Sequence, residues 1–290
     1  MCGKEKKMSW SVVGECITGN AHIRNNKPCQ DALKTYQVDD LGIICTLADG
    51  HGSHKCAYSD DGANIATSVA LSIIETIVWH HKEEELYAMM RSIKDVDLPK
   101  NIEREWKAQI KALHLNKKRE PVSNDKALYE LYGTTLLVLF VTKYFVFAMQ
   151  IGDGDILTVF NSGETSWLIE PDIQYGTETY SLCLNNSWKY FKNKLIPISK
   201  DTALPVLFLA STDGYANSFV SSDEFLKIGK DYLEIIRENE IDYLKAHLKD
   251  WLADASKCGS GDDITFVLVY NAGIDAFFGG QKRYEKKNNR

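Results

Sequence analysis

The chain has 290 residues, 44% of them hydrophobic, and a formal net charge of −6 at neutral pH. A chain of this length and composition can bury a substantial core, and we expect one large domain with insertions rather than two small ones. The acidic balance argues against a general nucleic-acid binder and against a protein of anionic membrane surfaces, because both normally present a basic face.

The predicted elements begin with a strand over residues 9–17 and a wholly apolar strand over 42–48. A helix over 62–80 follows, with apolar residues at helical spacing. The charged stretch over 82–118 keeps that spacing and predicts a helical hairpin, inserted against one face of a sheet.

Apolar runs separated by turn residues predict six further strands and two further helices. The strands are expected at 135–141, 144–151, 156–160, 206–212 and 264–270. A short strand is expected at 166–169, and the helices at 225–236 and 243–257.

The remaining segments carry weaker patterns. Residues 171–200 are irregular and rich in aromatic and Asn residues, which favours a flap beside a functional site, where substrates would be selected. Residues 1–8 and 272–290 are expected to be tails, the second one basic and solvated. The folded domain would therefore span 9–271.

The cysteines and the apolar stretches bear on the compartment. Seven cysteines, odd in number and with no C-x-x-C pair, predict reduced and mostly structural thiols. The polar start of the chain precedes no apolar run of signal-peptide length, and the apolar stretch over 135–151 is too short and too interrupted for a membrane helix. We therefore expect a cytoplasmic protein without a membrane partner.

Aspartates stand at the ends of three predicted strands. Asp49 follows the strand over 42–48, Asp213 follows the strand over 206–212, and Asp262 stands just before the last strand. Because strand ends meet at the rim of a sheet, we expect these three carboxylates to lie within a few ångströms of one another. They would form a candidate metal site.

Charge balance indicates which ions such a site would take. Three carboxylates in a partly desolvated cleft repel one another and need cations or protons to coexist. Hard oxygen ligands, including the backbone carbonyl of Gly50, favour Mg2+ or Mn2+ over zinc. Two such ions would leave the site with a charge of about +1, which suits a phosphate dianion.

The same residues indicate a reaction. A pair of divalent ions can orient a phosphate and lower the pKa of a shared water, so that it attacks as hydroxide near neutral pH. His51 stands two residues after Asp49 and could protonate an alkoxide leaving group. The expected reaction is attack of this dimetal-bound hydroxide on a phosphomonoester, with His51 as general acid.

Six short motifs occur in a fixed order along the chain. They are Gln30-Asp31-Ala32, Asp49-Gly50-His51-Gly52, Gly133-Thr134-Thr135, Gly152-Asp153, Ser211-Thr212-Asp213-Gly214 and Gly261-Asp262-Asp263-Ile264-Thr265. This set resembles the metal-dependent Ser/Thr protein phosphatases of the protein phosphatase 2C type, and more particularly a bacterial subgroup. The resemblance covers residues 9–271. It implies an α+β fold, a four-layer α/β/β/α sandwich of two packed antiparallel sheets flanked by helices.

The resemblance also implies a role for each acidic position. Asp49 would bridge two metal ions, one of which the Gly50 carbonyl would also bind. Asp213 and Asp262 would complete the coordination of the other metal ion. Asp153 would match the family's ligand for a third, weaker metal, shared with Asp213. The metals would lie at one end of the paired sheets.

The first motif departs from the family pattern, in which an Arg that holds phosphate precedes a Glu-Asp pair that holds metal-bound waters. Arg24 lies two residues further from Asp31 than expected, and Gln30 stands where Glu is usual. Phosphate contact is therefore open between Arg24 and His22. Asp31 and Gln30 are expected to act on coordinated waters, outside the ligand set.

The expected function is hydrolysis of phosphoserine and phosphothreonine in a protein substrate, in signalling that counteracts a Ser/Thr kinase. The cofactors would be two Mn2+ or Mg2+ ions, with a third implied by the family, and a monomer without a nucleic-acid partner is expected. Two alternatives remain open. One is a catalytically weak, metal-binding pseudophosphatase that serves as an adaptor, and the other is a phosphatase of a small phosphorylated metabolite.

Overall fold

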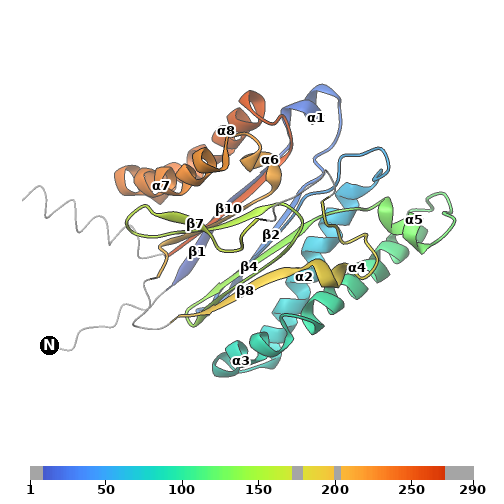
Figure 1. Ribbon diagram of the computed structural model, residues 1–290, viewed down its shortest axis with the longest axis horizontal. Helices are drawn as coiled ribbons and strands as arrows, with labels where there is room; N and C mark the ends of the chain where they lie inside the picture. Colours follow the sequence, from blue (N-terminus) through green and yellow to red (C-terminus); the bar gives the residue numbers. More distant parts are fainter. Residues whose placement is uncertain (1–8, 172–178, 199–203, 272–290) are drawn as a thin grey trace, which may run out of the picture.

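The computed structural model describes residues 9–171, 179–198 and 204–271. Within these ranges two antiparallel β-sheets pack face to face, and helices cover the outer face of each (Figure 1). This four-layer α/β/β/α arrangement confirms the predicted fold. Each layer boundary is filled by its own cluster of buried apolar side chains.

The first sheet has the strand order β1-β10-β9-β6-β7. Its strands are β1 (Trp10–Ile17), β6 (Asp155–Val159), β7 (Thr165–Trp167), β9 (Leu207–Ser211) and β10 (Ile264–Asn271). Its outer face is covered by α7 (Ser222–Asn239) and α8 (Ile241–Cys258), and the short helix α6 (Asp213–Ala216) follows β9.

The second sheet has the strand order β2-β3-β4-β5-β8. Its strands are β2 (Ala32–Val38), β3 (Gly42–Ala48), β4 (Leu136–Thr142), β5 (Phe145–Ile151) and β8 (Lys192–Pro197). The helices on its side are α2 (Ser59–His80), α3 (Glu83–Ile93), α4 (Asp97–Asn116) and α5 (Asp125–Glu130). The two helix groups lie on opposite sides of the paired sheets (Figure 1).

The central strands are mostly apolar because both of their faces are covered. β3, β4, β5, β6 and β9 are buried at every position. Between the sheets, side chains such as Ile43, Leu139 and Phe208 interdigitate. Burial on two faces removes the alternation of polar and apolar residues that marks a half-exposed strand.

Helix α2 is the main helix of the second outer layer. By length and composition alone it could cross a membrane, with a mean hydropathy of 1.4 over its most apolar window. Its small residues, among them Ala63, Ala66 and Ala70, are instead buried in the core cluster that includes α4 and the second sheet. Trp106 of α4 donates its ring N–H to the carbonyl of Gly62 at 3.0 Å. The helix therefore packs as a core element.

The edge strands β2 and β8 and two short helices, α1 (Asn20–Arg24) and α5, do not follow from the sequence patterns. Both edge strands are only half-buried, so their apolar signal is weak. β8 lies inside the segment predicted as a flap over 171–200, of which the structure describes 171 and 179–198. The predicted tails over 1–8 and 272–290 lie outside the described residues.

Candidate metal centre

Three acidic side chains meet at one end of the paired sheets. Asp49 directly follows β3, Asp153 lies in the turn that joins β5 to β6, and Asp213 begins α6 just after β9. One carboxylate oxygen from each lies within 4.8 Å of the other two. Asp49 comes from the second sheet and Asp213 from the first, and the turn that carries Asp153 crosses between them. The cluster therefore joins both sheets.

The backbone of Asp49 is held by two threonines at the start of β4. Its N–H donates to the hydroxyl oxygen of Thr135 at 3.0 Å. Its carbonyl accepts from the Thr135 N–H at 2.9 Å and from the Thr134 hydroxyl at 2.8 Å. The Gly133-Thr134-Thr135 motif thus positions Asp49 through the main chain and adds no charge.

Gly50 lies where no side chain fits. A Cβ atom there would lie 2.6 Å from the carbonyl oxygen of Gln30 and 2.7 Å from that of Ser59. Glycine keeps this turn close to both segments, and the Gly50 N–H donates to the Gln30 carbonyl at 3.1 Å. The next residue, His51, is anchored by its N–H on the carbonyl of Gly133 at 3.1 Å.

Neighbouring polar groups orient the other two carboxylates. The hydroxyl of Thr179 donates to Asp153 Oδ2 at 2.6 Å. The side-chain amide of Asn217 donates to Asp213 Oδ2 at 2.9 Å. Across the described residues, no lysine or arginine forms an ion pair with any of the three clustered aspartates.

In the metal-free protein, the surroundings of Asp49 and Asp213 favour the protonated form of each carboxyl group. Burial raises the pKa of Asp49 well above its usual range, and the charges of Asp31, Asp213, Asp262 and Asp153 raise it further. Burial and the charges of Asp153 and Asp262 raise the pKa of Asp213 to about 7, although a hydrogen bond with Asp49 opposes this rise. Divalent cations would take the place of these protons, so the hard oxygen donors fit Mg2+ or Mn2+.

Asp262 occupies a different place from the one expected. It is exposed and belongs to a second group with His22 and Asp263, whose ligand atoms lie within 4.8 Å of one another. Its charge still raises the pKa values of Asp49 and Asp213. Asp153, which the resemblance implies as a ligand shared with Asp213, forms the inner group with Asp49 and Asp213.

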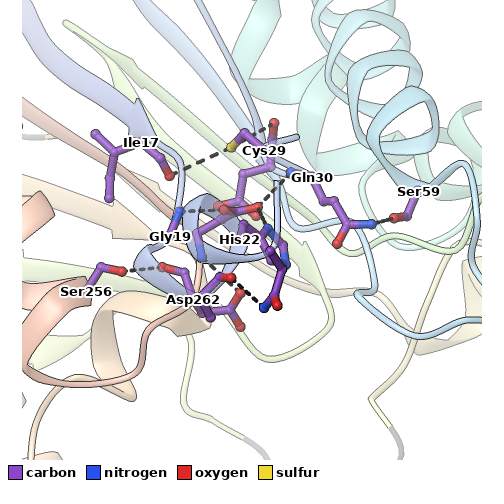
Figure 2. Close-up of polar contacts among 12 residues, drawn as sticks. Ile17, Gly19, His22, Cys29, Gln30, Ser59, Ser256 and Asp262 are labelled. Carbon is purple, nitrogen blue, oxygen red and sulfur yellow. Dashed lines mark hydrogen bonds and ion pairs between the residues drawn. The ribbon is translucent and has the colours of Figure 1, made fainter. Parts of the chain in front are cut away.

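Asp263 is a functional-site residue to which sequence reasoning assigned no role. Its buried carboxylate accepts from the N–H groups of Gly19 and Gln30, both at 2.6 Å, and lies 2.9 Å from His22 Nδ1. These bonds hold the loop before β2 against the start of β10 (Figure 2). The sequence signal for a second role was the pair of adjacent aspartates, Asp262 and Asp263. Adjacent residues in an extended chain point to opposite sides, so the two carboxylates could not share one position.

Gln30 and Asp31 follow in the same loop. Gln30 donates its side-chain amide to the Ser59 hydroxyl at 2.7 Å (Figure 2), while its Oε1 is buried without a partner among the described residues. Asp31 Oδ2 accepts from the hydroxyls of Thr212 and Thr265, both at 2.8 Å. Burial raises the pKa of Asp31 well above its usual range, which those two hydroxyls oppose. The orphaned Gln30 oxygen can accept a bond from a water at the metal centre.

The two candidates for phosphate contact lie on α1. His22 is tied to Asp263 through Nδ1, while Arg24 is exposed at the end of the helix. The helix is docked on the neighbouring loop by a bond from the Ala21 N–H to the carbonyl of Gly261 at 2.8 Å. His22 is therefore fixed beside Asp262, whereas Arg24 is exposed on the same short helix.

Comparisons with known proteins agree with this geometry. A family model described as protein phosphatase 2C matches residues 18–253. The chain belongs to the protein phosphatase 2C family. This membership makes it a metal-dependent protein phosphatase by class and confirms the resemblance seen in its motifs. No curated protein sequence matches the chain.

Several solved structures share the fold of this protein phosphatase 2C chain. The serine/threonine phosphatase Stp1 from Staphylococcus aureus has a TM-score of 0.58 at 16% identity, over 94% of this chain and 100% of that one. PstP/Ppp of Mycobacterium tuberculosis has a TM-score of 0.56 at 14% identity, over 90% and 98%. A sex determining protein of C. elegans has 0.59 at 14% identity, over 95% and 68%. At these identities the likeness concerns the fold.

Proposed function

We propose that this protein removes phosphate from phosphoserine and phosphothreonine in protein substrates and so counteracts a Ser/Thr kinase. The observation that best supports this proposal is the inner group of Asp49, Asp153 and Asp213, whose carboxylate oxygens lie within 4.8 Å of one another. Among the described residues, none of the three forms an ion pair with a lysine or arginine. Family membership supplies the reaction class. A monomer in the cytoplasm remains the expected form.

Asp49, Asp153 and Asp213 would hold Mn2+ or Mg2+ ions, with the Gly50 carbonyl and Asp262 as further ligands. Two such ions, or three, would neutralise the acids, orient a phosphate and activate a water. Asp31 and Gln30 would act outside the ligand set. The orphaned Gln30 oxygen would accept a hydrogen bond from a water, and the charge of Asp31 already acts on Asp49.

His51 is proposed to protonate the oxygen of the leaving serine or threonine. Burial lowers the pKa of His51, and the charge of Asp153 opposes that effect. Its backbone anchor on Gly133 holds it beside Asp49. A lowered pKa makes the protonated imidazole a stronger acid, which suits transfer of its proton to the leaving oxygen.

His22 and Arg24 remain the two candidates for phosphate contact. His22 is held beside Asp262 by its bond to Asp263, whereas Arg24 is exposed and can reach a bound phosphate only from the rim. His22→Ala and Arg24→Ala should separate them. The variant that raises KM for phosphopeptide without a matching loss of metal-induced thermal stabilisation identifies the phosphate contact.

The test compares substrates and one ligand variant. With millimolar Mn2+, the protein should hydrolyse phosphoserine and phosphothreonine peptides, and EDTA should abolish that turnover. Asp49→Asn should lose it with the fold retained, as judged by circular dichroism. Tight phosphopeptide binding without hydrolysis would instead identify an adaptor, and higher kcat/KM on sugar phosphates than on peptides would identify a metabolite phosphatase. Either result would overturn the proposal.

A further inference from the structure

Two cysteines form a close pair beside the candidate metal centre. Cys16 is the last residue but one of β1, and Cys29 lies in the loop between α1 and β2. Their sulfur atoms are 3.7 Å apart, and both are free, half-buried thiols. A disulfide has an S–S length of about 2.05 Å, so the sulfurs need to approach by about 1.7 Å to bond.

Of the two segments, the loop that carries Cys29 is the one that would move in this approach, because Cys29 lies outside any helix or strand. Cys29 Sγ contacts the carbonyl of Ile17 at 3.7 Å (Figure 2), and no helix or strand constrains the residue itself. Cys16 is held within β1, whose neighbour is β10. Closing the gap would therefore draw the Cys29 loop towards β1 rather than move the sheet.

Movement of that loop reaches the metal centre directly. Gln30, next to Cys29, donates its N–H to Asp263 and accepts from the N–H of Gly50. A shift of Cys29 would therefore displace Gln30 Oε1, which has no partner among the described residues. It would also displace the turn at Gly50, whose carbonyl is a proposed metal ligand. The first motif and the Asp49 turn are coupled through this one backbone bond.

A second connection runs from Cys16 through Thr265. The Thr265 hydroxyl lies 3.1 Å from Cys16 Sγ and 2.8 Å from Asp31 Oδ2, and it has a single proton to give. Asp31 in turn acts on Asp49 through its charge. A change of chemistry at Cys16 therefore changes the hydrogen bonding of Asp31 as well.

The two thiols differ in pKa, which suits a reaction in which one thiol reacts first and the other second. The hydrogen bond with Cys29 lowers the pKa of Cys16 to about 7, and the Thr265 hydroxyl adds to this effect while burial opposes it. The same pairing, together with burial, raises the pKa of Cys29. Cys16 is therefore the better nucleophile near neutral pH, and Cys29 is placed to attack it next.

We propose that Cys16 and Cys29 are a redox-modification site, which hydrogen peroxide converts to a disulfide that weakens metal binding and switches off phosphate hydrolysis. The thiolate of Cys16 attacks one oxygen of hydrogen peroxide, and the O–O bond breaks to give a sulfenic acid and a hydroxide, which takes up the proton that the Cys16 thiol released and leaves as water. Cys29 sulfur then attacks the Cys16 sulfur, the S–O bond breaks, and a second water leaves. Two thiols lose two electrons and the peroxide gains them. The effect on turnover rests on the proposed function, whereas the disulfide does not.

The other described cysteines provide a rival and a control. Cys56 and Cys183 both lie beside Gly133, since a Cβ there would be 3.2 and 3.4 Å from their sulfurs. They are the rival pair for cross-linking. Cys258 is exposed at the end of α8 and serves as the matched control, while Cys45 is buried within β3.

The experiment oxidises the full chain with a small excess of hydrogen peroxide in the presence of EDTA, which prevents metal-catalysed damage. Peptide mapping without reductant should find one cross-link, between the peptides that carry Cys16 and Cys29. After the EDTA is removed, the Mn2+ concentration needed for thermal stabilisation should rise about 10- to 100-fold, as for loss of a group that supports metal ligands. Phosphopeptide turnover at limiting Mn2+ should fall similarly, and dithiothreitol should restore both.

Variants identify the pair as the cause. Cys16→Ser and Cys29→Ser should each keep their metal response after peroxide, and Cys258→Ser should behave as wild type. A cross-link between Cys56 and Cys183 with Cys16 and Cys29 still free would overturn the proposal, as would a mapped Cys16–Cys29 disulfide that leaves the metal response unchanged. If no substrate is hydrolysed before oxidation, the proposed function fails, but the mapping and the Mn2+ response still decide on the thiol pair.

Discussion

At the residue scale, the acids of the candidate centre are positioned by groups that carry no charge. Thr134 and Thr135 hold the backbone of Asp49, and Thr212 and Thr265 donate to the carboxylate of Asp31. A lysine or arginine in those places would neutralise the acids and compete with a metal ion. Hydroxyl donors orient the carboxylates without neutralising them, so their negative charge remains available to bind metal ions.

The role of His51 can be tested through the leaving group. A general acid matters when the leaving oxygen is strongly basic, as in phosphoserine, and matters little when p-nitrophenolate leaves, because that anion is stable. His51→Gln should therefore lower kcat on phosphoserine peptides by about 100-fold or more. The loss on p-nitrophenyl phosphate should be much smaller. Equal losses on both substrates would assign His51 to binding or structure instead.

The raised pKa of Asp213 predicts a pH dependence of stability. Its folded value of about 7 lies above the ordinary aspartate value of 3.8. A raised carboxyl pKa stabilises the folded state at low pH, and this contribution is lost as pH rises through that window. As pH rises from about 4 to 7 in EDTA, the Tm of wild type should therefore fall relative to that of Asp213→Asn.

The control for that measurement is Mn2+. At the upper end of the pH range, added Mn2+ should raise the Tm of wild type above that of Asp213→Asn, because the variant lacks one ligand charge. A Tm difference that does not vary with pH in EDTA would show that Asp213 titrates as an ordinary exposed aspartate.

At the element scale, α2 depends on a close approach that only glycine permits. A Cβ on Gly62 would lie 2.0 Å from the carbonyl oxygen of Tyr132, which is backbone and cannot swing aside. The fully buried Trp106 also donates to the carbonyl of Gly62. The first turn of α2 is therefore pressed between α4 and the segment that leads into β4.

Gly62→Ala should destabilise the protein although alanine favours helices. Alanine gains about 1 kcal/mol over glycine in a helix interior, but overpacking against the backbone of Tyr132 should cost about 3 kcal/mol and leave a net loss of about 2 kcal/mol. Urea denaturation measures the change. Ser72→Ala, at an exposed position of the same helix, is the control and should leave stability unchanged or slightly raised. A more stable Gly62→Ala would disprove the close approach.

At the scale of the whole molecule, the acidic cluster brings together carboxylates from both sheets. Asp49 ends a strand of the second sheet, and Asp213 follows a strand of the first. A bound ion would tie these strand ends together, whereas the same acids without ions repel one another unless they are protonated. Metal binding should therefore act on the stability of the entire sandwich.

Metal removal tests this at the same scale. An ion that binds only the folded state stabilises it by about 2.7 kcal/mol at a hundred times its Kd. Thermal unfolding in saturating Mn2+ should therefore give a higher Tm than in EDTA at neutral pH. Asp49→Asn should reduce that difference. Lys227→Ala should leave it unchanged, because the ion pair of Lys227 with Glu224 lies on the exposed surface of α7. Identical melting curves with and without Mn2+ would rule out a metal centre here.

The sequence alone determined the central strands, the long helices and the acidic motifs, because uninterrupted apolar runs and Asp-Gly turns are local signals. β3 is found with the bounds predicted for it, and α2 differs from its prediction only in beginning at Ser59. The half-buried edge strands β2 and β8 escaped prediction because their exposed positions are polar.

Only the tertiary structure decided which acids meet. It placed Asp153 with Asp49 and Asp213, set Asp262 beside His22, and made Asp263 the anchor of the loop before β2. It also brought Cys16 and Cys29 together. Each of these pairings depends on how the two sheets stack and where their turns end. Contacts between residues distant in sequence are set by packing, and no local pattern encodes them.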